Sequence, residues 1–122
     1  MDVESLKVLF APFGAVSVRR MFGGAGIYAD GLCFAIAPRS GDVYIKCDVE
    51  TQATFTAAGS QPFVYEMRGQ PKTMAFWRLP AEAYDDEDAL NRWAQLGLDA
   101  ARRAAAAKAA KAAKPAARRK SR

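Results

Sequence analysis

The chain has 122 residues and a mass of 13.2 kDa, which is the size of a single domain. Because 51% of its residues are hydrophobic and 11% are aromatic, we expect a buried core and exclude a fully disordered chain. The chain contains no histidine, which excludes Ser-His and Cys-His dyads and removes the commonest metal ligand. We therefore expect a binding protein rather than an enzyme, with no cofactor and no metal.

The charge is concentrated at one end of the chain. Nine of the 18 Lys and Arg residues lie in residues 101–122, which contain no acid. Residues 1–100 contain the other nine together with all 13 acids, so their net charge is −4. No apolar run reaches the length of a membrane helix, and the acidic N-terminus lacks the features of a signal peptide. Two cysteines are too few for a disulfide scaffold, so the sequence favours a cytoplasmic protein.

The first predicted helix spans residues 2–12. Asp2 is suited to its N-terminus, and Pro12 and Gly14 end it. Its apolar stripe follows helical spacing and comprises Val3, Leu6, Phe10 and Phe13.

Three strands are predicted next, from an alternation that begins at Ala15, a dense apolar run at 32–37 and a second alternation at 43–47. Glycines at 23–26 and a short run at 27–30 separate the first strand from the second. A turn at 38–42 precedes the third strand.

A short helix at 49–58 is expected to follow, capped by Asp48 and ended by Gly59. Alternation at 63–68 and the run at 73–79 then predict two antiparallel neighbours joined by a turn at 69–72.

The last helix is expected to begin at the four acids of residues 85–88, which the helix dipole favours. Its apolar face comprises Leu90, Trp93, Ala94, Gly97, Leu98 and Ala101. Beyond residue 101 the Ala- and Lys-rich sequence predicts an exposed helical extension that frays by Pro115.

This order, α-β-β-β-α-β-β-α, predicts an α+β fold: a two-layer sandwich with a five-stranded, mainly antiparallel sheet covered by helices. We assign residues 1–100 to this domain. Residues 101–122 form a basic tail, helical at first and then disordered.

Residues 22–26, Phe-Gly-Gly-Ala-Gly, invite comparison with a phosphate-binding loop. The following segment reads as a strand rather than a helix, and no GK[ST] follows, so we predict a bulge or tight turn with glycines at positive φ. Cys33 and Cys47 lack CxxC spacing and cannot alone form a closed zinc site, so we expect buried apolar thiols rather than a redox pair.

Arg19 and Arg20 are adjacent in a predicted strand, so their side chains point to opposite faces. We expect one in solvent and one paired with a carboxylate such as Glu66; contact with an anion is the alternative. Four aromatic residues could stack nucleic-acid bases: Phe63, Tyr65, Phe76 and Trp77. Because residues 1–100 are net acidic, core and cross-strand packing is the better interpretation of these rings.

The tail has the charge pattern of a protein that binds the phosphate backbone of nucleic acids. Its nine candidate DNA-contacting residues are Arg102, Arg103, Lys108, Lys111, Lys114, Arg118, Arg119, Lys120 and Arg122. Such a segment does not read bases, so its binding would be non-specific and salt-sensitive. A purely solubilising extension is the other interpretation.

Five strings stand out in the middle of the chain: Arg19–Gly31 (RRMFGGAGIYADG), Phe34-Ala35, Tyr44–Asp48 (YIKCD), Pro62–Tyr65 (PFVY) and Met74–Trp77 (MAFW) with Pro80. With these strings the chain resembles the N-terminal domain of the TfoX/Sxy family, and the likeness covers roughly residues 3–100. The motif residues with an expected structural or partner-binding role are Arg19, Arg20, Met21, Phe22, Gly23, Gly24 and Gly26. The resemblance implies the same α-β-β-β-α-β-β-α fold.

The resemblance also implies a regulator of natural competence for DNA transformation, acting as a co-activator with the cyclic-AMP receptor protein rather than as an enzyme. Competence regulators of this kind carry a second, helical C-terminal domain, where this sequence has only the basic tail, so it resembles a stand-alone N-terminal domain. The alternative is a chaperone-like protein-interaction domain with no DNA function. We expect a monomer or a homodimer.

Overall fold

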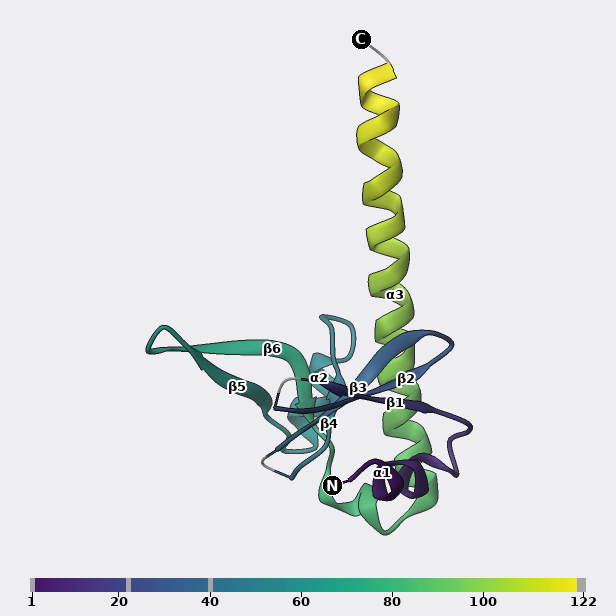
Figure 1. Cartoon of the computed structure of the whole chain (residues 1–122), viewed down its shortest axis with the longest axis vertical. Helices are drawn as coiled ribbons and strands as arrows, with labels where there is room; N and C mark the ends of the chain where they lie inside the picture. The colour runs from purple at the N-terminus through teal and green to yellow at the C-terminus, as the bar shows by residue number, and fades with distance from the viewer. Residues whose placement is uncertain (1, 22, 40, 121–122) are drawn as a thin grey trace.

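The computed structural model describes residues 2–21, 23–39 and 41–120, with side chains through residue 112. Within these ranges the helices are α1 (Val3–Phe10), α2 (Gln52–Ala57), the short 3-10 helix η1 (Ala81–Tyr84) and α3 (Glu87–Lys120). The strands are β1 (Ser17–Met21), β2 (Gly24–Ala29), β3 (Leu32–Pro38), β4 (Tyr44–Lys46), β5 (Pro62–Met67) and β6 (Gln70–Arg78). They form one antiparallel sheet in the order β1-β2-β3-β4-β6-β5 (Figure 1).

The α+β class is confirmed, but the described residues form six strands rather than the predicted five. The additional strand is β2, which begins inside the glycine stretch predicted as a bulge or turn. In that stretch Gly23 has a positive φ of 70°, whereas Gly24 and Gly26 are strand residues. A Cβ at Gly24 would collide with the carbonyl of Ala37, and one at Gly26 would lie 2.6 Å from the Met21 sulfur. These glycines are therefore required for close packing, not for a turn.

A β-bulge in β3 divides the sheet's apolar residues between its two faces. Ile27 pairs with Ala35 and Tyr28 with Cys33, which leaves Phe34 as the extra residue. Phe34 and Ala35 consequently both join the main core. Cys33 lies against a second cluster, on the opposite face of the sheet, formed by other strand residues.

The main core contains buried side chains from all three α-helices and the sheet. The predicted apolar face of α3 is confirmed, since Leu90, Trp93, Ala94, Gly97, Leu98 and Ala101 are all buried. In α1, the fully buried Leu6 and Phe10 confirm the predicted stripe, and the Asp2 carboxylate accepts a hydrogen bond from the Ser5 amide at 2.8 Å. The core thus fixes α3 across β3 and β4.

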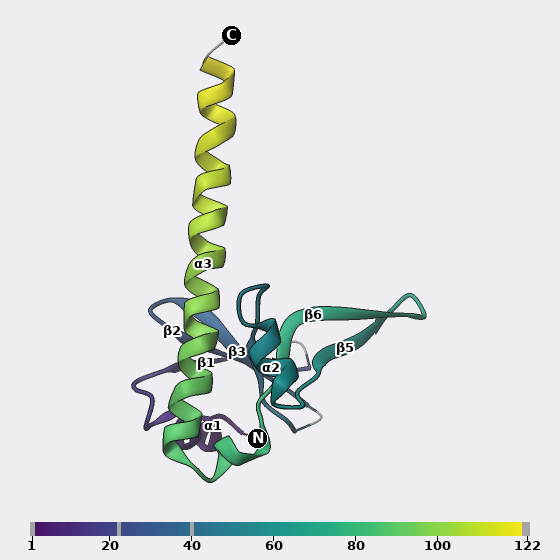
Figure 2. The same ribbon diagram turned by 180° about the vertical axis from the view of Figure 1, so that it is seen from behind.

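Two parts of the chain extend beyond the packed layers, so the architecture is less regular than the predicted sandwich. The β5–β6 hairpin projects to one side, and the C-terminal part of α3 continues alone, away from the sheet (Figures 1 and 2). The hairpin turns at Arg68 and Gly69, both at positive φ, rather than at the predicted residues 69–72. The backbone of α3 stays helical through Pro115 to Lys120, because the surrounding alanines are the strongest helix formers. No helix in the described ranges has the length and apolar character needed to cross a membrane.

Candidate functional site

The first two cations of the predicted DNA-binding tail contact the domain instead of projecting from it. Arg102 donates from Nη2 to the Asp30 carboxylate at 2.6 Å. Asp30 is held in place by the tight turn between β2 and β3, where Asp30 and Gly31 have φ of 53° and 76°. Arg102 therefore ties α3 to the tip of a hairpin.

Arg103 forms the second tie between α3 and the domain. Its guanidinium donates to both carboxylate oxygens of Asp48, at 2.7 and 3.0 Å, and Nε lies 3.1 Å from a carboxylate oxygen of Glu50. Asp48 also accepts hydrogen bonds from the Glu50 amide and the buried Thr51 hydroxyl, so it caps the turn before α2. The hydrogen bonds from Arg103 lower the pKa of the Asp48 carboxyl. The pair is consequently a charged, bidentate anchor.

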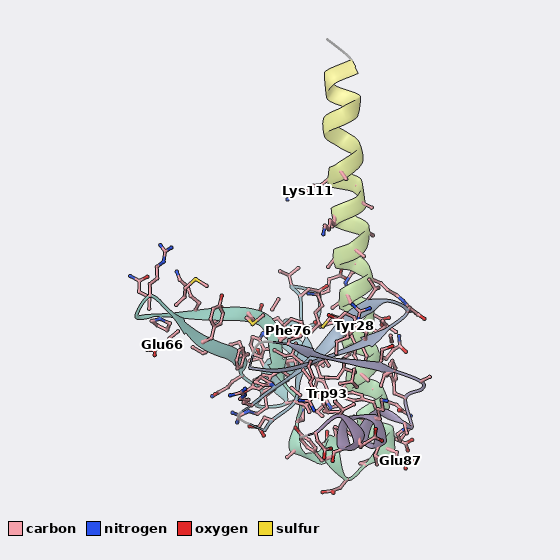
Figure 3. The ribbon with its side chains drawn as sticks, in the orientation of Figure 1. Tyr28, Glu66, Phe76, Glu87, Trp93 and Lys111 are labelled. Atoms are coloured by element: carbon pink, nitrogen blue, oxygen red, sulfur yellow. The ribbon has the colours of Figure 1, made fainter. Side chains whose placement is uncertain are left out.

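The free part of the tail begins after this anchor. Lys108 and Lys111 are exposed on α3, and Figure 3 shows Lys111 projecting sideways from the part of the helix beyond the domain. Lys114, Arg118, Arg119 and Lys120 continue the helical backbone, whereas Arg122 lies outside the described residues. The anchor and the extension belong to one helix, so the orientation of the extension is set by the core.

The family-motif residues divide between the two sides of the sheet. Arg19 lies over the Tyr28 ring, with Cζ 5.0 Å from its centroid. Arg20 pairs with the core-facing Ala25, so its side chain is on the other side, where it lines a hollow of about 540 Å³ together with Arg39. The predicted pairing with Glu66 is wrong, because β1 and β5 are opposite edges of the sheet.

The remaining motif residues surround these arginines. Met21 is 46% exposed, Gly23 lies in the β1–β2 turn at positive φ, and Gly24 and Gly26 allow the close packing of β2. Phe22 lies outside the described residues.

Cys47 is the predicted buried thiol, and Cys33 is partly buried. Cys47 is 3% exposed in the main core, whereas Cys33 packs with the second cluster on the opposite face. Burial raises the pKa of both thiols. Opposite faces of one sheet keep the two sulfurs from pairing, and the protonated state makes each a poor nucleophile.

The second cluster occupies a face to which no helix contributes a buried residue in the described part of the chain. Ile36 pairs with Tyr44 and Tyr44 with Arg78, while Lys46 pairs with Phe76, so these five side chains share one face. We call this surface the open face; its other members are Arg19, Tyr28, Cys33, Phe63 and Tyr65. Ile36, Tyr44 and Phe76 are each less than 9% exposed, beneath longer side chains.

Cations lie over the rings of the open face. Lys46 Nζ is 5.0 Å from the centroid of Phe76, and Arg78 Cζ is 6.0 Å from that of Tyr44. The predicted cross-strand packing is confirmed for Phe63, whose ring meets Tyr44 edge-on at 5.0 Å.

The interleaved cations are the feature that sequence reasoning missed, because the net charge of residues 1–100 hides a local excess. The sequence does contain a signal for these cations. Lys46 and Arg78 each lie two residues from an aromatic residue on the same strand, which places cation and ring on the same face of the sheet. In the described ranges no group of three or more Cys, Asp or Glu is placed to hold a metal ion.

The chain was compared with known proteins. A family model described as the TfoX N-terminal domain matches residues 8–101. Comparison with curated proteins finds no matching sequence. Because the match spans most of the chain, including the sheet, the open face and the buried part of α3, this protein belongs to the TfoX N-terminal domain family.

Proposed function

We propose that this chain is a non-enzymatic regulatory protein of the TfoX/Sxy type, a transcriptional co-regulator of competence. In this proposal the sheet domain contacts a transcription factor such as the cyclic-AMP receptor protein. The extension of α3 adds DNA affinity without sequence preference. The raised pKa of both thiols supports a binding role, because it leaves the chain without an activated cysteine.

The observation that carries the DNA-binding part is the continuity of α3 from the core into the basic extension. Arg102 and Arg103 are held by acids of the domain, so seven cations remain beyond the anchor: Lys108, Lys111, Lys114, Arg118, Arg119, Lys120 and Arg122. Positions 111, 114 and 118 follow the spacing of one helical face. A helix that presents cations at one-turn intervals suits the closely spaced phosphates of DNA.

The test is DNA binding by fluorescence anisotropy at several salt concentrations, with the full chain and with a chain ending at Arg103. Ending there keeps both anchors. If five of the seven cations contact phosphates, log K should fall against log salt with a slope of about −4.5, from about −0.9 per contact. The shortened chain should lose this binding.

A charge-matched control separates the extension from overall charge. Lys108, Lys111 and Lys114 are changed to Gln in one variant, and the exposed Lys7, Arg39 and Arg92 in the other. The first variant should lower the salt slope by about 3, whereas the second should leave it nearly unchanged. Equal binding by the full and shortened chains would overturn the proposal for the extension and favour the protein-interaction domain without DNA function.

A further inference from the structure

We propose that the open face is the docking surface for a protein partner, and that it recognises a segment in which acidic residues flank an apolar anchor. The inference rests on the proposed function only in assuming that the sheet domain binds a protein. It names the surface and the chemistry of the partner.

The charge of the open face is the first argument. Its strand positions carry Arg19, Lys46, Arg78 and Lys72, which pairs with Tyr65, and, in the described residues, no acid, although the domain as a whole is net acidic. In the described residues Arg78 pairs with Asp42, whose carboxylate is 3.7 Å away, with both side chains about half exposed. An exposed pair at this distance leaves most of the Arg78 charge available to a partner. The surface is therefore complementary to carboxylates.

The arrangement of these cations defines the spacing of the partner. Lys46 and Arg78 lie beside the two ends of the Tyr44–Phe76 pair, because Lys46 pairs with Phe76 and Tyr44 with Arg78. The two cations are thus separated by about 7 Å along the strands, with an aromatic centre between them. A partner that places carboxylates beside the two cations and one apolar side chain against the neighbouring half-buried rings of Phe63 and Tyr65 contacts both kinds of group. Aromatic and arginine residues that become buried on binding are the usual energetic centres of protein interfaces.

Single-stranded nucleic acid is the rival ligand, and the geometry favours it less. Base stacking requires accessible ring faces, but Tyr44 and Phe76 are each less than 9% exposed and carry a cation over the ring. Only the rings of Tyr28, Phe63 and Tyr65 are half-buried within this face. The basic extension of α3, which supplies most of the free positive charge, belongs to an element that packs on the other side of the sheet.

The same separation lets both surfaces work at once. Among the residues whose side chains are described, those of α3 that join a buried cluster belong to the main core, whereas the open face is formed by strand residues. A DNA molecule on the extension would therefore leave the open face free for a protein, as a co-regulator requires.

The experiment is a nitrogen-15 NMR titration of the full chain. The probe is a hexapeptide with two glutamates on each side of a leucine–phenylalanine pair, and the matched control peptide carries lysines in place of the glutamates. A ten-nucleotide thymidine strand is the third ligand. Residue-resolved shifts separate the open face from the cationic extension, to which any acidic peptide is also attracted. We expect the acidic peptide to shift amides of β3, β4 and β6.

Two variants test the residues. Arg19→Gln, Lys46→Gln and Arg78→Gln together should weaken peptide binding at the open face about tenfold, since three exposed charge contacts are lost. The charge-matched control with Gln at Lys7, Arg39 and Arg92 should change it less than twofold. Amide spectra that change only near the substituted residues establish that both variants are folded.

Three results would overturn the inference. Shifts confined to residues 104–122 would show that only the extension attracts the peptide. Equal weakening by the two variants would assign the binding to net charge. Tighter binding of the thymidine strand than of the peptide at the open face would identify a nucleic-acid platform. Because failure of the extension to bind duplex DNA alters none of these measurements, the two proposals fail independently.

Discussion

Gly97 lies where α3 crosses the sheet most closely, and replacing it by Ala tests that packing. A Cβ at this position would be 2.6 Å from Ile45 Cγ2 and 2.8 Å from the Phe34 carbonyl oxygen. Overpacking of a core costs about 1–3 kcal/mol, and two contacts under 3 Å, one of them to backbone, place this site near the upper value. Ala gains about 1 kcal/mol of helix propensity over Gly. We therefore expect Gly97→Ala to lower the free energy of unfolding by about 2 kcal/mol.

The assay is urea denaturation followed by circular dichroism, with an unchanged m-value as the sign that stability alone has shifted. Gln95 supplies the control, because it is exposed on the same helix two residues earlier. At position 95 Ala should be more stable than Gly by about 1 kcal/mol, whereas at position 97 the order should reverse. A Gly97→Ala variant as stable as the parent would show that α3 does not approach the sheet as closely as described.

Three further outcomes are expected. Hydrogen bonds from Arg103 lower the pKa of Asp48, so the pair stabilises the fold above the unfolded pKa of about 3.9 and loses that effect as pH falls through the folded pKa. Arg103→Gln should therefore raise the pKa of Asp48 measured by NMR, and it should make the free energy of unfolding less sensitive to acid. Gly24→Val should destabilise the chain by at least 2 kcal/mol in urea melts, because its side chain would meet the Ala37 backbone. The Cys47 thiol should react with Ellman's reagent at pH 8 far more slowly in the native than in the unfolded protein, because burial raises its pKa.

Helices with one apolar face were predictable because a periodic pattern needs no knowledge of the partner surface. Leu6 and Phe10 in α1, and Leu90, Trp93 and Leu98 in α3, are all buried as the spacing indicated. The end of the domain was less well placed. The apolar stripe stops at residue 101, but the contacts of α3 with the domain continue for two more residues through charged groups.

The parts of the fold and of the candidate site that the sequence did not predict depend on contacts between residues distant in sequence. Arg102 and Arg103 resemble the other tail cations, and only the folded chain places Asp30 and Asp48 beside them. The bulge at Phe34 follows the pairing of two strands, so the face occupied by Ile36 could not be read from one alternation. Gly24 and Gly26 lack strand propensity, but close packing against β1 and β3 places them in a strand.

Rigidity of the extension should matter for DNA binding apart from its charge. The domain is net acidic, and a flexible tail would fold back onto it; the helix instead places Lys108 about 7.5 Å beyond Arg103 and later cations farther away. The cations after Lys108 thus lie beyond the screening length of about 8 Å at physiological salt, so they interact weakly with the acids of the domain. Changing the exposed Ala104 and Ala106 to Gly should weaken helix formation there by about 1 kcal/mol per site and lower DNA affinity severalfold at equal net charge. Changing both to Gln, a good helix former, should leave the affinity unchanged, and anisotropy titrations that find the two pairs equal would show that charge alone determines binding.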